Sequence, residues 1–228
     1  MSTRAVFFDV DFTLIYPGPT FDGEGYRRFA DRHGVGVAPD RFSAAVRAAS
    51  VELDSAQDRI YRPDLFVRYA RRVIEEMGGA GPGVETCAWE IYDAWAACQH
   101  FSLYDDVLPA FRSLRQAGLS IGLISNTHRC LQSFQSHFAL DGLIAGAISS
   151  SEHGYMKPHP SIFEAALRLV GVEPGEAVMV GDSLTHDVEG AQGVGMRGVL
   201  IARSGQVEDA SSDVPVIRSL LELPPLLA

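Results

Sequence analysis

Short, continuous apolar runs recur along the chain. They occupy residues 5–8, 119–124, 177–180 and 199–202. A run without polar alternation is typical of a strand that is covered on both faces. Stretches with a helical pattern lie between these runs, at residues 107–116, 161–170 and 186–192. The alternation predicts an α/β fold, in which β/α units build a parallel sheet with helices on both faces.

The segment between the first two runs has a different pattern. Residues 16–101 contain no convincing strand run but four amphipathic segments, at 23–33, 41–53, 64–77 and 84–98. Turn signals rich in glycine or proline separate them, at 34–39, 62–63 and 78–83. We therefore expect an α/β core formed by residues 1–15 and 102–228, with an all-helical domain of residues 16–101 inserted after the first strand.

Composition narrows the class of protein. The 228 residues are 46% hydrophobic and 21% charged, which is typical of a globular chain. The formal charge of −10 argues against broad binding to nucleic acid or to anionic membranes. No apolar run is long enough for a signal sequence or a membrane span, so we expect a cytoplasmic protein. The three cysteines, Cys87, Cys98 and Cys130, match no zinc spacing and are expected to be buried free thiols.

Acidic side chains follow the first run directly. Asp9 and Asp11 are two residues apart in an extended segment, so both side chains can point to one side. Ligand sites of open α/β sheets lie beyond the carboxyl ends of the strands, where this pair falls. An acidic turn exposed to solvent has the same appearance, so the pair alone does not establish chemistry.

Three further elements supply polar groups. Ser125 ends the second run and is followed by Asn126 and Thr127, which would also suit an ordinary helix N-cap. Lys157 lies between two runs and is followed by prolines. Asp182 ends the third run, and Asp187 follows five residues later. Together, the strand ends supply acidic side chains and a hydroxyl, and an intervening loop supplies a lysine. This combination predicts a metal-assisted phosphoryl-transfer site.

Taken in order, these motifs resemble the haloacid dehalogenase superfamily of hydrolases. The first motif is Asp9-Val10-Asp11-Phe12-Thr13-Leu14, the second Ser125-Asn126, the third Lys157-Pro158, and the fourth Gly181-Asp182 through Asp187. The resemblance covers residues 1–15 and about 102–228 and implies a Rossmann-like core. It also implies that the helical insert is a cap domain over the site. Phe12 is a departure, because the family most often has glycine there.

The resemblance implies a magnesium-dependent phosphatase. Asp9 would attack phosphorus and become an aspartyl phosphate. Mg²⁺ would be held by the carboxylates of Asp9 and Asp182 and the backbone carbonyl of Asp11. Asp11 would also act as general acid and base.

Supporting roles follow from the same resemblance. Ser125 would bond a phosphoryl oxygen, and Lys157 would offset the charge of Asp9 and the phosphate. Asp187 would orient Lys157 or the metal's waters. Possible substrate contacts are Thr13, Asn126 and Thr127.

Several alternatives stay open from sequence. A phosphomutase shares the same core residues, and a haloacid dehalogenase shares the family but lacks the second acid that Asp11 supplies. A phosphate-binding or signalling protein without catalysis is the alternative from another class. A small-molecule phosphate monoester is the expected substrate class, and candidate pocket residues are Tyr16, Arg59, Tyr61 and Arg62. Monomer and homodimer are both open, because an apolar set could form either the core of the insert or a dimer face: Trp89, Ile91, Trp95 and Phe101.

Overall fold

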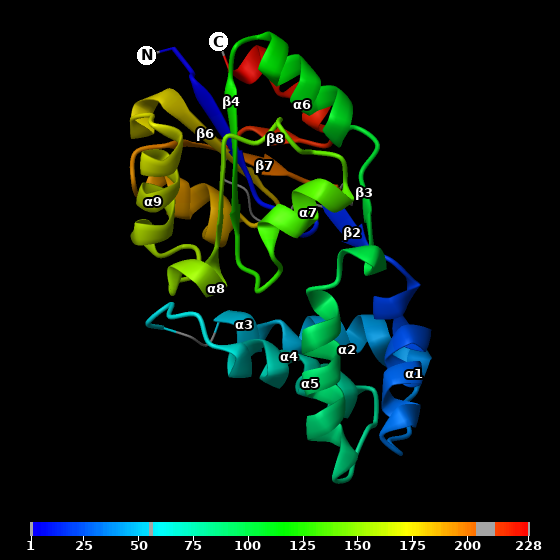
Figure 1. The fold of residues 1–228 in the computed structure, drawn as a ribbon. Helices are drawn as coiled ribbons and strands as arrows, with labels where there is room; N and C mark the ends of the chain where they lie inside the picture. Colours follow the sequence, from blue (N-terminus) through cyan, green and yellow to red (C-terminus); the bar gives the residue numbers. More distant parts are fainter. Residues whose placement is uncertain (1, 55–56, 204–212, 228) are drawn as a thin grey trace. The chain divides into compact units, whose positions relative to one another are not determined.

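The computed structural model describes residues 2–54, 57–203 and 213–227 and divides into two compact units (Figure 1). The core unit comprises Met1–Tyr16 and Leu103–Ala228, and the insert unit comprises Pro17–Ser102. Each junction lies one residue from the predicted boundary. The two units are described separately below.

A six-stranded sheet, entirely parallel, forms the centre of the core unit. Its order is β5-β4-β1-β6-β7-β8. The strands are β1 (Ala5–Phe8), β4 (Ser120–Ser125), β5 (Gly146–Ser149), β6 (Ala177–Gly181), β7 (Arg197–Ile201) and β8 (Val216–Ile217). The four predicted runs are β1, β4, β6 and β7, and the prediction of a parallel α/β sheet is confirmed. The edge strands β5 and β8 carry no such run, because each is covered only in part.

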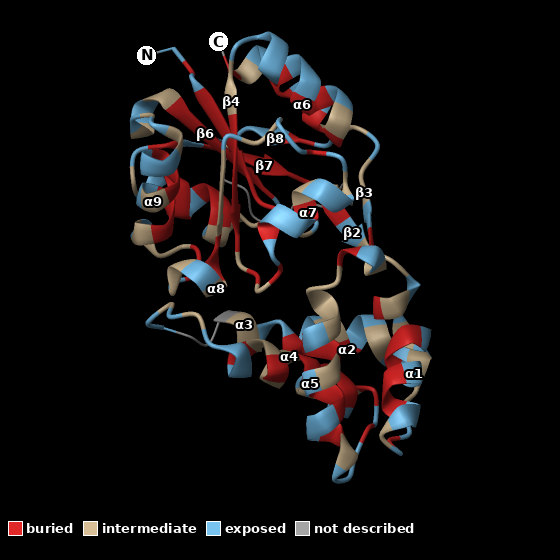
Figure 2. Ribbon diagram, in the orientation of Figure 1, coloured by how far each residue is buried: buried red, intermediate tan, exposed pale blue. Residues whose placement is uncertain are grey.

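Helices cover both faces of this sheet. The main ones are α6 (Val107–Gln116), α7 (Leu131–His137) and α9 (Pro160–Val170), with the short α8 (Ser150–His153) and α10 (Gly190–Gln192). Side chains of β1 alternate between the faces. Phe7 packs into a buried cluster with Phe163 of α9, whereas the ring of Phe8 lies 4.9 Å from that of Phe111 of α6. Figure 2 shows the resulting buried sheet between layers with exposed outer faces.

Strand register brings three strand ends together. Phe8, the last residue of β1, aligns with Leu123 of β4 and with Val180 of β6. The backbone N–H of Asp9 then donates to the carbonyl of Val180 over 2.9 Å. Polar residues that follow these three strands therefore reach the same edge of the sheet, where open α/β folds place their sites.

The insert unit is helical. Its helices are α1 (Gly23–Arg32), α2 (Phe42–Ala49), α3 (Val51–Asp54), α4 (Pro63–Glu76) and α5 (Gly83–Trp95). Ile91 and Phe101 are buried in its interior, and the ring of Phe21 lies 4.5 Å from that of Trp95. Trp89 is 40% exposed. Three of the four apolar residues singled out from sequence thus belong to the packing of the insert unit.

Both ends of the insert lie side by side. Strand β2 (Ile15–Pro17) pairs with β3 (Phe101–Leu103) in a separate two-stranded sheet. Beyond this pair, the N–H of Gly18 donates to the carbonyl of His100 over 2.7 Å. The chain therefore leaves and re-enters the core unit at adjacent points.

The described cysteines form no disulfide bond, and two of the three, Cys87 and Cys98, are buried as expected. The expectation is wrong for Cys130, which is exposed because it precedes α7 at the surface. Within the described ranges, no helix combines the length and apolar character needed to cross a bilayer.

Candidate active site

A tight turn presents Asp9 at the end of β1. The N–H of Phe12 donates to the carbonyl of Ile15 over 2.7 Å, and that of Leu14 to the carbonyl of Val10 over 2.8 Å. Phe12 adopts φ +62°, in the left-handed region that glycine enters freely and other residues enter at a cost of about 1–2 kcal/mol. The backbone here has the conformation that suits the family's usual glycine, although the side chain is phenylalanine.

Lys157 lies between two carboxylates. Its Nζ donates to Oδ1 of Asp9 and to Oδ1 of Asp187, over 2.6 Å in each case. All three residues are at least 90% buried, so these ion pairs are shielded from water. Burial lowers the pKa of Lys157, but Asp187 and Asp9 outweigh that effect and raise it above its ordinary value. The ammonium therefore stays charged at this site.

Asn126 holds the loop that carries Lys157. Its Nδ2 donates to the carbonyl of Lys157 over 3.0 Å, and its Oδ1 accepts from the N–H of the same residue over 2.7 Å. Both ends of this side-chain amide are thus engaged by one residue. A contact from Asn126 to substrate stays a prediction.

Asp182 and Asp187 follow β6 and join Asp9 in one acidic group. Each offers a carboxylate oxygen, and these oxygens lie within 4.8 Å of one another. Asp187 stands in a π-helical turn (Leu184–Glu189), and its Oδ2 accepts from the N–H of Ser183 over 3.0 Å. A methyl group on Gly181 would meet Oδ2 of Asp187 at 2.2 Å, so glycine is needed for this approach.

The charge of this group fits a divalent cation. Three carboxylates and the one ammonium of Lys157 give a net charge of −2 when all are ionised. Desolvation by burial raises the pKa of Asp9 to about 7, and Lys157 only partly offsets this. Desolvation of the carboxylate, then the charges of Asp9 and Asp187, also raise the pKa of Asp182, although the residue as a whole is classed as exposed. Hard oxygen ligands with uncompensated charge are what Mg²⁺ prefers.

Two hydroxyls at the same edge have no hydrogen-bond partner among the described residues. They are Oγ of Ser125, at the end of β4, and Oγ1 of Thr13 in the turn after Asp9. Ser125 is 1% exposed and Thr13 is fully buried. Buried hydroxyls are normally bonded, so both are available to a ligand.

The carboxylate of Asp11 is not part of this acidic group and pairs with Arg129, a residue that sequence reasoning missed. Arg129 donates from Nη1 to Oδ1 and Oδ2 of Asp11 and from Nη2 to Oδ1, all over 3.1 Å. Its backbone N–H donates to Oγ1 of Thr127 over 3.0 Å, so Thr127 shapes the turn that leads to Arg129. An arginine four residues after Ser125 gives no sign in the sequence that it will be buried.

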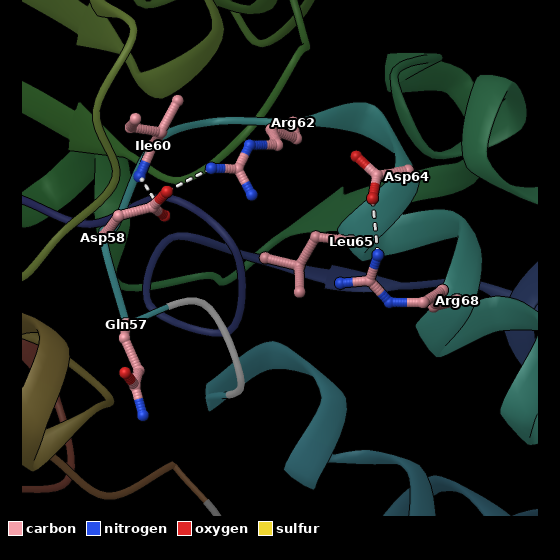
Figure 3. A pocket seen from close by; sticks show the side chains of 7 residues that line it. All are labelled: Gln57, Asp58, Ile60, Arg62, Asp64, Leu65 and Arg68. Carbon is pink, nitrogen blue, oxygen red and sulfur yellow. Dashed lines mark hydrogen bonds and ion pairs between the residues drawn. The ribbon is translucent and has the colours of Figure 1, made fainter.

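The remaining candidates contact residues of their own units. Tyr16 pairs with Tyr104 in the core unit, at 4.9 Å between ring centroids. In the insert unit, Tyr61 shares a 2.5 Å hydrogen bond with Tyr92. Arg62 pairs with Asp58 at the rim of a cavity of about 380 Å³, which Figure 3 shows. Of the candidates, this cavity includes only Arg62; it is lined by Gln57, Asp58, Ile60, Arg62, Asp64, Leu65 and Arg68.

The chain is similar to known hydrolases. The family of haloacid dehalogenase-like hydrolases matches residues 3–195. The chain is 32% identical to N-acylneuraminate-9-phosphatase of Mus musculus, over 98% of this chain and 93% of that protein. It is also 32% identical to glyceraldehyde 3-phosphate phosphatase of Methanopyrus kandleri, over 93% and 91%.

Solved structures of similar fold include members of the same family. A HAD phosphatase from Thermococcus onnurineus matches with a TM-score of 0.65 and 27% identity, over 99% of this chain and 98% of that one. A 2-haloacid dehalogenase from Pseudomonas syringae pv. Tomato matches with a TM-score of 0.66 and 26% identity, over the same shares.

The fold, the acidic edge of its sheet and the relatives define the class of protein, a hydrolase built on a parallel sheet covered by helices. The chain belongs to the haloacid dehalogenase-like hydrolases. The expectation of an enzyme of this superfamily is confirmed, and the relatives named above include phosphatases.

Proposed function

We propose that the chain is a magnesium-dependent phosphatase for a small phosphate monoester. The observation that carries this proposal is the ammonium of Lys157 shared between Asp9 and Asp187, beside the carboxylate of Asp182. Asp9 is the nucleophile, and Lys157 keeps it from repelling the incoming phosphate dianion. The relatives' names suggest a phosphorylated sugar or sugar acid as the substrate.

Each remaining residue has one task in this proposal. Mg²⁺ would be held by the carboxylates of Asp9 and Asp182 and the backbone carbonyl of Asp11, and it would neutralise phosphate charge. The unpartnered hydroxyl of Ser125 binds a phosphoryl oxygen, and that of Thr13 is a second contact. Asp11 protonates the leaving oxygen and then takes a proton from water. The insert unit serves as the cap that selects the substrate.

The test is hydrolysis of p-nitrophenyl phosphate with magnesium and with a chelator, in wild type and in Asp9→Asn. The wild type should be active only with the metal, and Asp9→Asn should be inactive but folded. The control, Asp141→Asn, changes an exposed aspartate that contacts only Ser136 among the bonds of the described chain, and it should stay active.

Two further assays distinguish the alternatives. Chloride release from 2-chloropropionate in place of phosphate release would indicate a dehalogenase. The panel of phosphate esters should include N-acylneuraminate 9-phosphate and glyceraldehyde 3-phosphate. Isomerised phosphate ester without free phosphate would indicate a mutase. Activity retained by Asp9→Asn would overturn the assignment of the nucleophile.

A further inference from the structure

A buried arginine, Arg129, forms a bidentate ion pair with Asp11, the second acidic residue of the first motif. Arg129 is 1% exposed, and its guanidinium approaches both carboxylate oxygens of Asp11, with three N–O distances of 3.1 Å. The side chain of Asp11 is 17% exposed, so part of it stays accessible. A planar fork on a carboxylate fixes orientation as well as charge.

The turn that carries Arg129 is itself fixed. Oγ1 of Thr127 accepts from the N–H of Arg129 over 3.0 Å. The carbonyl of Thr127 accepts from the hydroxyl of Ser150 over 3.4 Å and from the N–H of Ser151 over 3.3 Å. The backbone of the turn that carries Arg129 is therefore tied to α8.

This position separates the two acids of the first motif. The carboxylate of Asp9 belongs to the acidic group with Asp182 and Asp187, and that of Asp11 does not. The bidentate contact with Arg129 holds the carboxylate of Asp11 outside that group.

We infer that Arg129 is the positioning residue for Asp11, holding its carboxylate where it exchanges a proton with the leaving oxygen. The inference rests on the proposed phosphatase function. Arg129 donates three hydrogen bonds to the carboxylate of Asp11, whereas Asp9 is paired with Lys157. We therefore expect a substitution of Arg129 to affect proton transfer more than nucleophilic attack.

Substrates with different leaving groups separate these two steps. An alkoxide must be protonated as it leaves, whereas p-nitrophenolate is a stable anion and needs little help. For a two-step hydrolysis, kcat/KM reports events up to departure of the first product. We therefore compare kcat/KM for a simple alkyl phosphate, glycerol 3-phosphate, with that for p-nitrophenyl phosphate.

Arg129→Met should lower kcat/KM for the alkyl phosphate by about 100-fold and for the aryl phosphate by less than about tenfold. Arg129→Lys keeps the positive charge but loses the planar, bidentate guanidinium. Its kcat/KM for the alkyl phosphate should therefore be about tenfold higher than that of Arg129→Met. Asp11→Asn should show the same preference, and adding Arg129→Met to it should cause little further loss. If Arg129→Met does not fold, Arg129→Lys serves as the test: its kcat/KM should fall more for the alkyl phosphate than for the aryl phosphate.

The control is Arg197→Met, which changes an arginine that contacts Thr3 and Leu226 near the chain ends. Its alkyl-to-aryl ratio should equal that of the wild type. Equal losses on both substrates in the Arg129 variants, or no loss, would overturn the inference and leave the phosphatase proposal standing. A wild type inactive on both esters with magnesium would overturn both.

Discussion

At the scale of single residues, close approach decides the shape of the site. Gly181 has no side chain, and this lets Asp187 lie against the end of β6 and reach Lys157. A methyl group there would meet the carboxylate at 2.2 Å, too close for any small adjustment. The glycine is therefore required by packing beside the site and not by an unusual backbone angle.

Gly181→Ala should push Asp187 away from Lys157 and lower kcat/KM by at least about tenfold, because the ammonium loses one of two fixed partners. The measurement is hydrolysis of p-nitrophenyl phosphate with magnesium. Gly36→Ala is the matched control, since a methyl group there meets nothing within 4 Å. Equal activity in both variants would contradict this account of Gly181.

Lys157 can be observed in isolation. The chain has 19 basic residues of the lysine and arginine types, and Lys157 is the single lysine among them. Selective isotope labelling of lysine therefore gives one side-chain NMR signal, from the candidate site itself.

That signal should titrate with a pKa above the ordinary value for lysine, because Asp187 and Asp9 stabilise the charged form. Asp9→Asn should lower the pKa. Because the pKa of Lys157 is raised on folding, the charged ammonium stabilises the folded state. This stabilisation is fully present below about pH 10.4 and is lost as pH rises through the pKa of the folded state. An ordinary pKa in the wild type would contradict the buried ion pairs.

At the scale of elements, the site forms because parallel strands end together. Asp9 and Asp182 follow β1 and β6, Ser125 is the last residue of β4, and Lys157 lies in the loop before α9. The predicted runs and the residues after them were sufficient to anticipate this meeting. Edge strands were not anticipated, because β5 and β8 lack a continuous apolar run.

The local sequence did not predict the hydrogen-bond partners of the side chains at the site. Nothing in the sequence distinguishes Arg129 from the other arginines, and it is the turn after β4 that brings it to Asp11. Asn126 reads as a substrate contact, yet both ends of its amide hold the backbone of Lys157. Such pairings depend on residues about 30 to 120 positions apart, beyond the reach of any periodicity argument.

The acidic group at the strand ends gives a prediction for pH and metal. Burial raises the pKa of Asp9 to about 7, so the folded chain binds more protons than the unfolded chain between about pH 4 and 7. In chelator, the free energy of unfolding should therefore fall as pH rises through this interval, by at most about 1.4 kcal/mol per pH unit for the one proton on Asp9.

Magnesium needs the ionised carboxylates, so its affinity should increase over the same interval and its binding should release protons. Thermal unfolding of wild type and Asp9→Asn at several pH values, with chelator and with magnesium, tests both effects. Asp9→Asn should flatten the slope in chelator. Stability of the wild type that rises with pH in chelator would contradict the raised pKa.

At the scale of the whole molecule, the insert is a separable unit of the chain. Its two ends are joined by the β2–β3 pair, and the core unit has its own buried sheet and the full acidic group. A formal charge of −10 is spread over a protein whose candidate site needs a cation to accept phosphate.

Replacing residues 18–100 by a short glycine-serine linker should therefore leave a core unit that folds and binds magnesium. This variant should still hydrolyse p-nitrophenyl phosphate slowly, but it should lose discrimination among natural phosphate esters, because the proposed cap is gone. Cooperative unfolding and the substrate panel check the two parts. Undiminished selectivity would contradict the role of the insert as the cap.

The central claim is that the phosphoryl group passes through a covalent bond to Asp9. The most direct measurement is the stereochemical course at phosphorus, with a substrate whose phosphoryl group is made chiral by oxygen isotopes and an alcohol acceptor in place of water. Two successive in-line displacements predict retention of configuration. Inversion would mean a single direct displacement, and it would contradict the aspartyl-phosphate mechanism.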